Sequence, residues 1–285
     1  MLRSGCFSVL LRVGIGLAVA FPAQAQLATS VSPDTPPDAS IAKLLTEAQT
    51  LQTQYHESEA LAKYEQVLSK APATYEALWQ AAVLSVRIGA RYTDETRKAA
   101  YFSAARLYAN RALVVKSNGA EGHYAEALAL TSQATLLTAR GRLLAYREMK
   151  PHVFMAVARR PNWADAWQLL GRWHYRVDHY SLLERIFSRL FLGGTPSGAG
   201  TRKDIDALVR AHELDPKRIQ VCYDLARVHL NQGQRSRAVA VLQEAVALTP
   251  VTAEELEISR RCRLLLAQLN RQLHRQVQRY IRSKN

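Results

Sequence analysis

The sequence predicts an all-α protein in which pairs of helices repeat and stack into a solenoid. Residues 219–252 place small, apolar and helix-ending residues at fixed positions, and the same spacing recurs earlier in the chain. No stretch alternates apolar and polar residues for long enough to indicate a β-sheet. The 285 residues are 48% hydrophobic and contain few glycines and prolines, so the chain can bury an ample core.

The clearest repeat begins at Ile219. Counted from there, Ala226, Ala238 and Ala245 fall at positions 8, 20 and 27, where small side chains let two helices approach closely. Large apolar residues and helix-ending residues complete the pattern: Leu225 and Leu242 at positions 7 and 24, Gly233 at 15 and Pro250 at 32. This is the tetratricopeptide pattern, a unit of about 34 residues that forms two antiparallel helices.

Weaker copies precede this unit, which predicts about five tetratricopeptide-like repeats over residues 41–251. They are marked by Ala48, Ala60, Tyr64 and Pro72; by Ala109 and Ala112; by Ala127, Ala156 and Pro161; and by Gly171, Ala211 and Pro216. Short alanine-rich amphipathic helices can produce the same spacing as the first copy. The fourth unit is split, because its second helix begins only near Asp204, after a loop insertion near residues 190–203. Such units cannot bury their apolar faces alone, so we expect them to stack.

Residues 1–25 are typical of a signal peptide. Two arginines precede an apolar stretch, and Ala23-Gln24-Ala25 then matches the small-x-small cleavage rule. The stretch is too short for a membrane span, although an uncleaved anchor or an arginine-rich organelle transit peptide would share these features. We expect an exported protein, periplasmic or secreted, with organelle targeting as the alternative. The proline-containing residues 26–40 predict a disordered linker.

Cys222 and Cys262 are the two cysteines that follow the predicted signal. An exported protein could join them in a disulfide. Cys222 occupies position 4 of the last repeat, whereas Cys262 lies well into the next helix, so we expect a large axial offset. A disulfide needs Cα atoms within about 7 Å. The offset therefore favours two free, semi-buried thiols that pack as small hydrophobic groups.

Positive charge is concentrated at the C-terminus. Lys and Arg number 38 against 24 Asp and Glu, a formal charge of +14, and no acid follows Ile258. Residues 252–285 predict a basic amphipathic capping helix with a stripe of Leu265, Leu269, Leu273, Val277 and Ile281. Arg271, Arg275 and Arg279, spaced by four, form a candidate anionic-surface site. The simpler interpretation is a solenoid cap whose basic face is only solvated.

Signatures of catalysis are absent from the sequence. It contains no HExxH, paired CxxC, Gly-x-Ser-x-Gly or P-loop motif. The glycine-rich residues 192–200 lack the GK[ST] ending and a preceding buried strand, so a flexible loop explains them better than a phosphate cradle. His174 and His179 are five residues apart, so they do not share one face of a helix, and both are expected at the surface. We expect no enzyme activity, catalytic residue, metal site, cofactor or small-molecule substrate.

Three segments of the chain carry a family resemblance. They read A-V-A-R-R-P-N-W-A-D-A-W-Q-L-L-G-R-W-H-Y from Ala156, L-E-R-I-F-S-R-L-F-L-G-G-T-P from Leu183, and A-H-E-L-D-P from Ala211. Together they resemble the regulator of microtubule dynamics family over about residues 75–269, including its split repeat, in which an amphipathic segment and a proline-containing loop separate the two helices. The resemblance implies an all-helical, non-enzymatic fold. Animal members are associated with microtubules and organelle contacts, a role that does not carry over to a chain with a bacterial-type signal.

The concave groove is the predicted binding site. In tetratricopeptide units, positions 2, 5, 9, 12 and 13 of the first helix line it. Here they include Tyr124, Leu128, Gln168, Arg172, Tyr175, Arg176, Tyr223, Arg227 and Asn231. Three arginines beside tyrosines suit an acidic peptide or a C-terminal carboxylate. The sequence therefore predicts a scaffold for a protein or peptide partner. Two alternatives stay open: groove residues that are merely solvated, and a peripheral membrane protein held to anionic lipid by the C-terminal helix. We do not expect a nucleic-acid partner.

Overall fold

A computed structural model describes residues 39–284, and over that range it contains twelve α-helices and no strand. The predicted signal peptide and all of the predicted linker before Ala39 lie outside the described residues. The helices are α1 Ala39–Thr53, α2 Glu57–Lys70, α3 Tyr75–Arg91, α4 Glu95–Val115, α5 Ala120–Ala134, α6 Ala139–Arg159, α7 Ala164–Asp178, α8 Leu182–Phe191, α9 Thr201–Leu214, α10 Ile219–Asn231, α11 Arg235–Ala247 and α12 Ala253–Lys284.

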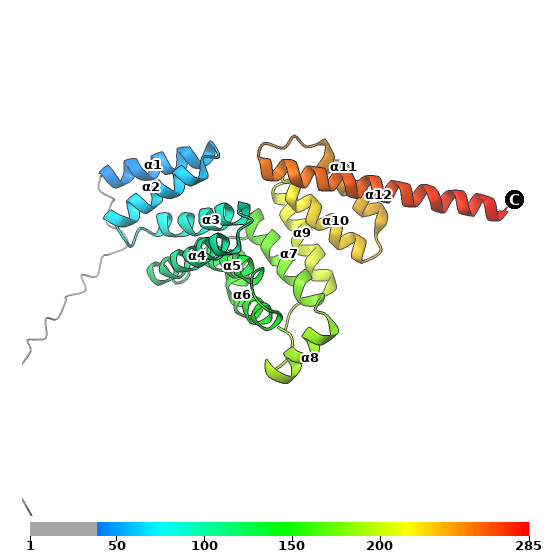
Figure 1. The fold of residues 1–285 in the computed structure, drawn as a ribbon, viewed down its shortest axis with the longest axis horizontal. Coiled ribbons are helices and arrows are strands. Elements are labelled where there is room, and N and C mark those ends of the chain that lie inside the picture. The colour runs from blue at the N-terminus through cyan, green and yellow to red at the C-terminus, as the bar shows by residue number, and fades with distance from the viewer. Residues whose placement is uncertain (1–38, 285) are drawn as a thin grey trace, which may run out of the picture. The chain divides into compact units, whose positions relative to one another are not determined.

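Neighbouring helices pack as pairs along the chain (Figure 1). The most extensive contacts join α1 to α2, α3 to α4, α5 to α6, α7 to α9 and α10 to α11. The fourth pair is split, because α8 lies between α7 and α9 in sequence and packs against α6 instead. Each pair then packs mainly against the pair before or after it, and α12 covers α11 and α10. The fold is an all-α, tetratricopeptide-like solenoid with a C-terminal capping helix, as the sequence predicts.

Small residues form the contacts between paired helices. All ten alanines that the repeat spacing marks are completely buried: Ala48, Ala60, Ala109, Ala112, Ala127, Ala156, Ala211, Ala226, Ala238 and Ala245. Gly171 allows the closest approach, since a Cβ atom there would lie 2.6 Å from Cγ of Leu208 on the paired helix α9. Large side chains such as Tyr64 and Leu242 fill the remaining space and are also fully buried. Dispersion and hydrophobic burial along these seams stabilise the fold.

Helix ends follow local sequence signals. Pro72, Pro161, Pro216 and Pro250 each come two or three residues after the end of α2, α6, α9 or α11. Asp94 caps α4 by accepting a hydrogen bond from the Arg97 amide at 2.7 Å. Between α10 and α11, Gly233 takes a positive φ of 73°, a conformation that glycine adopts without a steric cost. The prolines thus end the second helix of each of these pairs, and short turns such as that at Gly233 allow paired helices to run antiparallel, except that the α7–α9 pair is joined through the α8 insertion.

In α12, the capping helix, the buried residues match the predicted apolar stripe only in part. In α12, Ile258, Cys262 and Leu269 are buried against α10 and α11. Leu265 packs beside them, whereas Leu273 is 58% exposed. The expectation that Leu273 is buried is therefore wrong: it lines an open pocket with Arg235, Ser236 and Val239 of α11, so its side chain is not covered. The side chains of Val277 and Ile281 lie outside the described residues.

Cys222 and Cys262 are free thiols, as expected, but both are fully buried rather than semi-buried. Burial disfavours the thiolate and raises the pKa of Cys222 to about 12 and that of Cys262 to about 11. Both thiols are therefore protonated and unreactive at neutral pH.

Within residues 39–284, no helix has the length and hydropathy needed to cross a bilayer.

Candidate functional site

Two of the predicted groove residues belong to the core. Tyr124 on α5 is 8% exposed, and its ring lies 4.5 Å from that of Trp163. Burial is the main cause that raises the pKa of its hydroxyl. Leu128, one turn further along α5, packs against the same core cluster. The third pair therefore offers less groove surface than the repeat positions predict, because both side chains pack into the core, Tyr124 against Trp163 just before α7.

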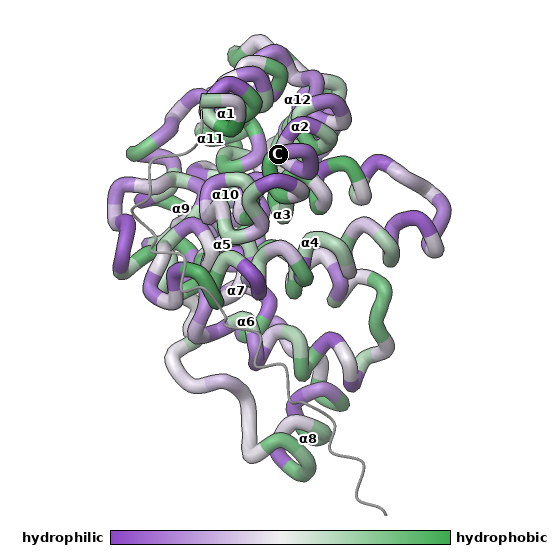
Figure 2. The backbone as a smooth tube through the Cα atoms, turned by 90° about the vertical axis from the view of Figure 1, so that its left-hand side faces the viewer, coloured by the Kyte–Doolittle hydropathy of each residue, from purple (hydrophilic) through white to green (hydrophobic). Residues whose placement is uncertain are grey.

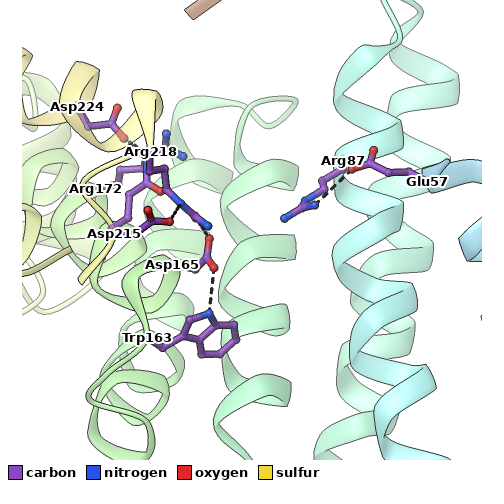
Figure 3. Close-up of polar contacts among 9 residues, drawn as sticks. Glu57, Arg87, Trp163, Asp165, Arg172, Asp215, Arg218 and Asp224 are labelled. Carbon is purple, nitrogen blue, oxygen red and sulfur yellow. Dashed lines mark hydrogen bonds and ion pairs between the residues drawn. The ribbon is translucent and has the colours of Figure 1, made fainter. Parts of the chain in front are cut away.

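Four other predicted groove residues form a polar seam between α7 and α10, and Figure 3 shows one of them, Arg172, near Asp224. Asp224 on α10 accepts hydrogen bonds from Nε2 of Gln168 at 2.8 Å and from Nε of Arg172 at 2.6 Å. Two turns further along α10, Asn231 donates to the Tyr175 hydroxyl. At the start of both helices, Arg218 pairs with Asp165, which also accepts from the Trp163 indole at 2.9 Å. This seam joins the first helices of consecutive repeats.

The seam neutralises one of the three arginines proposed to bind a partner. Burial disfavours the Arg172 cation, but the charge of Asp224 and its hydrogen bond outweigh burial and raise the pKa of the guanidinium. Arg172 is thus committed to a partner inside the chain. Sequence spacing could not reveal this, because Asp224 occupies position 6 of its repeat, which is not among the groove positions 2, 5, 9, 12 and 13.

Five predicted residues do meet at one cavity of about 370 Å³. They are Arg172, Tyr175 and Arg176 from α7, with Tyr223 and Arg227 from α10. The remaining lining comes from residues that the groove rule missed: Thr131, Tyr146, Met149, Trp173, Leu208, Gln220, Asp224, Val228, Ile258 and Arg261. Tyr146 and Met149 lie on α6, the second helix of its pair, and Ile258 and Arg261 lie on the capping helix α12. The groove positions are defined only for the first helix of each repeat, so they could not include these residues.

The cations around this cavity differ in how they are engaged. Arg176 lies 3.4 Å from Glu184 and 5.8 Å above the Tyr146 ring. Arg261 pairs with Glu257 one turn earlier on α12, at 3.1 Å. Arg227 is exposed, lies 5.8 Å from the ring centroids of both Tyr175 and Tyr223, and has no carboxylate partner among the described residues. Its guanidinium is thus free to bind an anion, and the two rings hold it in place.

The histidines do not form a metal site in the part of the chain that the structure describes. His123 and His152 approach through their Nδ1 atoms at 3.1 Å, but no third ligand of a suitable type joins them there. His174 corrects an expectation. It is 3% exposed rather than at the surface, and its Nδ1 has no hydrogen-bond partner within residues 39–284. Burial and the nearby Lys203 lower the pKa of His174 to about 4.

The candidate anionic-surface row is only partly described. Arg271 and Arg275 are exposed on α12, and the side chain of Arg279 lies outside the described residues. Neither Arg271 nor Arg275 lines the cavity. The row and the cavity are therefore separate features of the molecule.

Comparison with known proteins supplies the family. The family model described as regulator of microtubule dynamics protein 1-3 matches residues 44–270, which is most of the chain. The chain belongs to the regulator of microtubule dynamics family. The family match includes the split fourth pair and all of the lining of the cavity. Regulator of microtubule dynamics protein 3 of Bos taurus is 28% identical over 167 residues, 57% of this chain and 34% of that protein. The chain thus spans about a third of the length of that relative.

Solved structures agree with the fold of this family member. A thermophilic TPR protein of Thermus thermophilus superposes with a TM-score of 0.57 at 16% sequence identity, over 79% of this chain and 99% of that one. A MamA protein of Desulfovibrio magneticus gives a TM-score of 0.47 at 16% identity, over 74% of this chain and 96% of that one. At such identities, the first likeness establishes the tetratricopeptide-like fold alone.

Proposed function

We propose that this chain is a non-enzymatic scaffold that binds a protein or peptide partner through a carboxylate in the cavity between α7 and α10. Arg227 supports this most directly. It is an exposed cation without a carboxylate partner among the described residues, and two tyrosine rings flank it. A guanidinium presents two parallel donors that match a carboxylate, which fixes both the position and the orientation of the ligand.

The partner's chemistry is narrower than an acidic segment in general. Asp224 lies in the same cavity and would repel a run of negative charges, although Arg172 neutralises it in part. Arg176 can provide a second contact only by exchanging Glu184, at 3.4 Å, for the ligand. The cavity therefore suits one carboxylate, such as a chain terminus or a single Asp or Glu, beside an apolar residue that packs on Tyr146 and Met149.

Selection from a displayed peptide library tests this proposal, with the affinities of the selected peptides then measured by fluorescence anisotropy. We expect the selected peptides to share a carboxylate at a fixed position. Arg227→Gln should weaken their binding about 10- to 100-fold, because hydrogen bonds to charged groups contribute about 1.5–3 kcal/mol. Arg140→Gln, at an exposed arginine outside the cavity, is the matched control. Equal affinity for parent and Arg227→Gln would refute the assignment.

We further propose that the chain is exported and that its mature N-terminus is Gln26. The small-x-small sequence at Ala23-Gln24-Ala25 after an apolar stretch supports cleavage there. Mass spectrometry of the native protein decides the question, since an intact Met1 would exclude both the cleaved signal and the periplasmic assignment.

A further inference from the structure

Helix α8 is held in a defined position by contacts at both of its ends. The Ser181 hydroxyl and the Glu184 carboxylate form a reciprocal capping box at its N-terminus. After its C-terminus, Arg147 of α6 donates to the carbonyl oxygens of Leu192 and Gly194. Lys150 of α6 reaches the Ser197 hydroxyl at 2.9 Å. The segment is therefore a folded part of the surface.

The outer side of α8 is apolar. Leu182, Leu183, Ile186 and Leu190 are between 47% and 78% exposed, and their spacing places them on one side of the helix. The opposite side carries the buried Ser188, and Phe187, on the flank between the two sides, packs against the core. In Figure 2, α8 lies at the bottom of the view, and its tube carries green, hydrophobic stretches. Exposed apolar residues that cluster in this way mark an interaction surface.

Positive charges border the apolar strip. Arg185 and Arg189 are exposed and follow one edge of it, one turn apart. The single acid of α8, Glu184, is engaged by the Ser181 amide at 2.8 Å and by Arg176 at 3.4 Å. Arg185 also donates to the Asp178 carbonyl at 2.8 Å, which leaves its charge without a carboxylate partner among the described residues. The strip thus has a basic edge and no free acidic one. Arginine side chains of this kind can extend their charged groups to phosphates while their stems stay against apolar surface.

We propose that α8 docks this member of the family on a bilayer that contains anionic lipids, with the leucine strip inserted at the level of the headgroups and Arg185 and Arg189 contacting lipid phosphates. A second copy of the chain fits less well. A two-fold contact through α8 would bring its arginines toward those of the partner without an acid to offset them. An anionic membrane satisfies both the apolar strip and the charged edge.

Flotation with lipid vesicles tests the proposal in the full chain. The probes are vesicles of phosphatidylcholine alone and of phosphatidylcholine with a minority of phosphatidylglycerol. The parent should bind the anionic vesicles more strongly, and Leu183→Gln/Leu190→Gln should reduce its partitioning about tenfold or more, since each leucine loses its burial in lipid. The control is Leu107→Gln/Leu264→Gln, at leucines on α4 and α12 that are exposed to a similar degree. Glutamine preserves helix propensity in both variants.

Two further variants separate the charged elements. Arg185→Gln/Arg189→Gln should weaken binding to anionic vesicles only, and the component lost should be the one that salt suppresses. Arg271→Gln/Arg275→Gln/Arg279→Gln should leave most of the binding in place. The proposal is overturned if the parent floats with neither vesicle, if both leucine double variants bind alike, or if only the C-terminal triple variant loses binding. A concentration-dependent dimer that Leu183→Gln/Leu190→Gln dissociates would instead assign the strip to a second copy.

Discussion

At the scale of single residues, stability depends on side chains that are small enough to fit between paired helices. Ala238 on α11 is completely buried against α10, whereas Ala240, two residues further along the same helix, is exposed. The two alanines have the same intrinsic helix propensity. They therefore separate the effect of packing between helices from the effect of the local helix.

Replacing Ala238 by Leu should overpack the α10–α11 seam and lower the free energy of unfolding by about 1–3 kcal/mol. Ala240→Leu should change it by less than about 0.5 kcal/mol, because its side chain extends into solvent. Urea denaturation of both variants and the parent measures the difference. Equal stability of the two variants would mean that position 20 of this repeat does not lie in the seam.

Buried His174 makes stability depend on pH. The unfolded chain protonates this histidine near pH 6.5, whereas the folded protein does so only near pH 4. In that window the unfolded state binds more protons, so the contribution of His174 to stability falls as the pH falls. Asp204 acts in the opposite direction, because burial raises its pKa to about 6.

His174→Phe isolates the histidine, since its ring already packs at right angles to those of Phe154 and Trp173. Between pH 7 and pH 5, the parent should lose about 2 kcal/mol more of its unfolding free energy than His174→Phe does. Urea denaturation at the two pH values checks this. A substitution at the exposed His56 is the control for a change at a histidine outside the core. Parallel losses in parent and His174→Phe would contradict a buried, neutral His174.

At the scale of elements, α12 has two parts with different roles. The part up to Leu269 buries Ile258, Cys262 and Leu269 against the last pair, whereas Leu273, beyond it, is exposed. The part up to Leu269 therefore protects the apolar side of α10 and α11 from water. A solenoid without its cap exposes such a surface and tends to aggregate.

Ending the chain after Thr252 should produce a protein that aggregates or unfolds at a clearly lower temperature, because the buried residues of α12 are removed. Ending it after Gln272 keeps all three of those residues and should change the melting temperature little. Differential scanning calorimetry with light scattering distinguishes the two truncations. A stable, monomeric protein that ends at Thr252 would show that α12 is not needed as a cap.

At the scale of the whole molecule, contacts are made between neighbouring pairs, so stability should be local. Tyr64 on α2 and Leu242 on α11 are both fully buried, in separate hydrophobic clusters. In a linear array, a defect raises local opening mainly in its own repeat and the next one.

Hydrogen exchange measured by mass spectrometry can follow this locality. Tyr64→Ala should speed exchange in α1 to α3 and leave α10 to α12 close to the parent, and Leu242→Ala should do the reverse. Each change removes several kcal/mol of packing, about 3–5 for an aromatic and 2–5 for a leucine. Faster exchange throughout the chain from either variant would indicate a single cooperative unit instead.

The sequence alone determined the packing between paired helices. The ten buried alanines, the prolines after the helices and the delayed second helix of the fourth unit all follow from spacing along one chain. Such spacing is informative because the helical period places each residue on a known face. The convergence of Tyr175, Arg176, Tyr223 and Arg227 on one cavity follows from the same rule.

Only the tertiary structure decided which of those residues remain free. Asp224 engages Arg172 and Gln168, Trp163 packs on Tyr124, and Leu273 stays exposed beside α11. The exposure of the α8 strip likewise depends on α8 packing against α6 through its other side. These outcomes depend on how consecutive pairs are placed against one another. A repeat pattern specifies the contacts inside a unit and leaves the contacts between units to side chains far apart in the sequence.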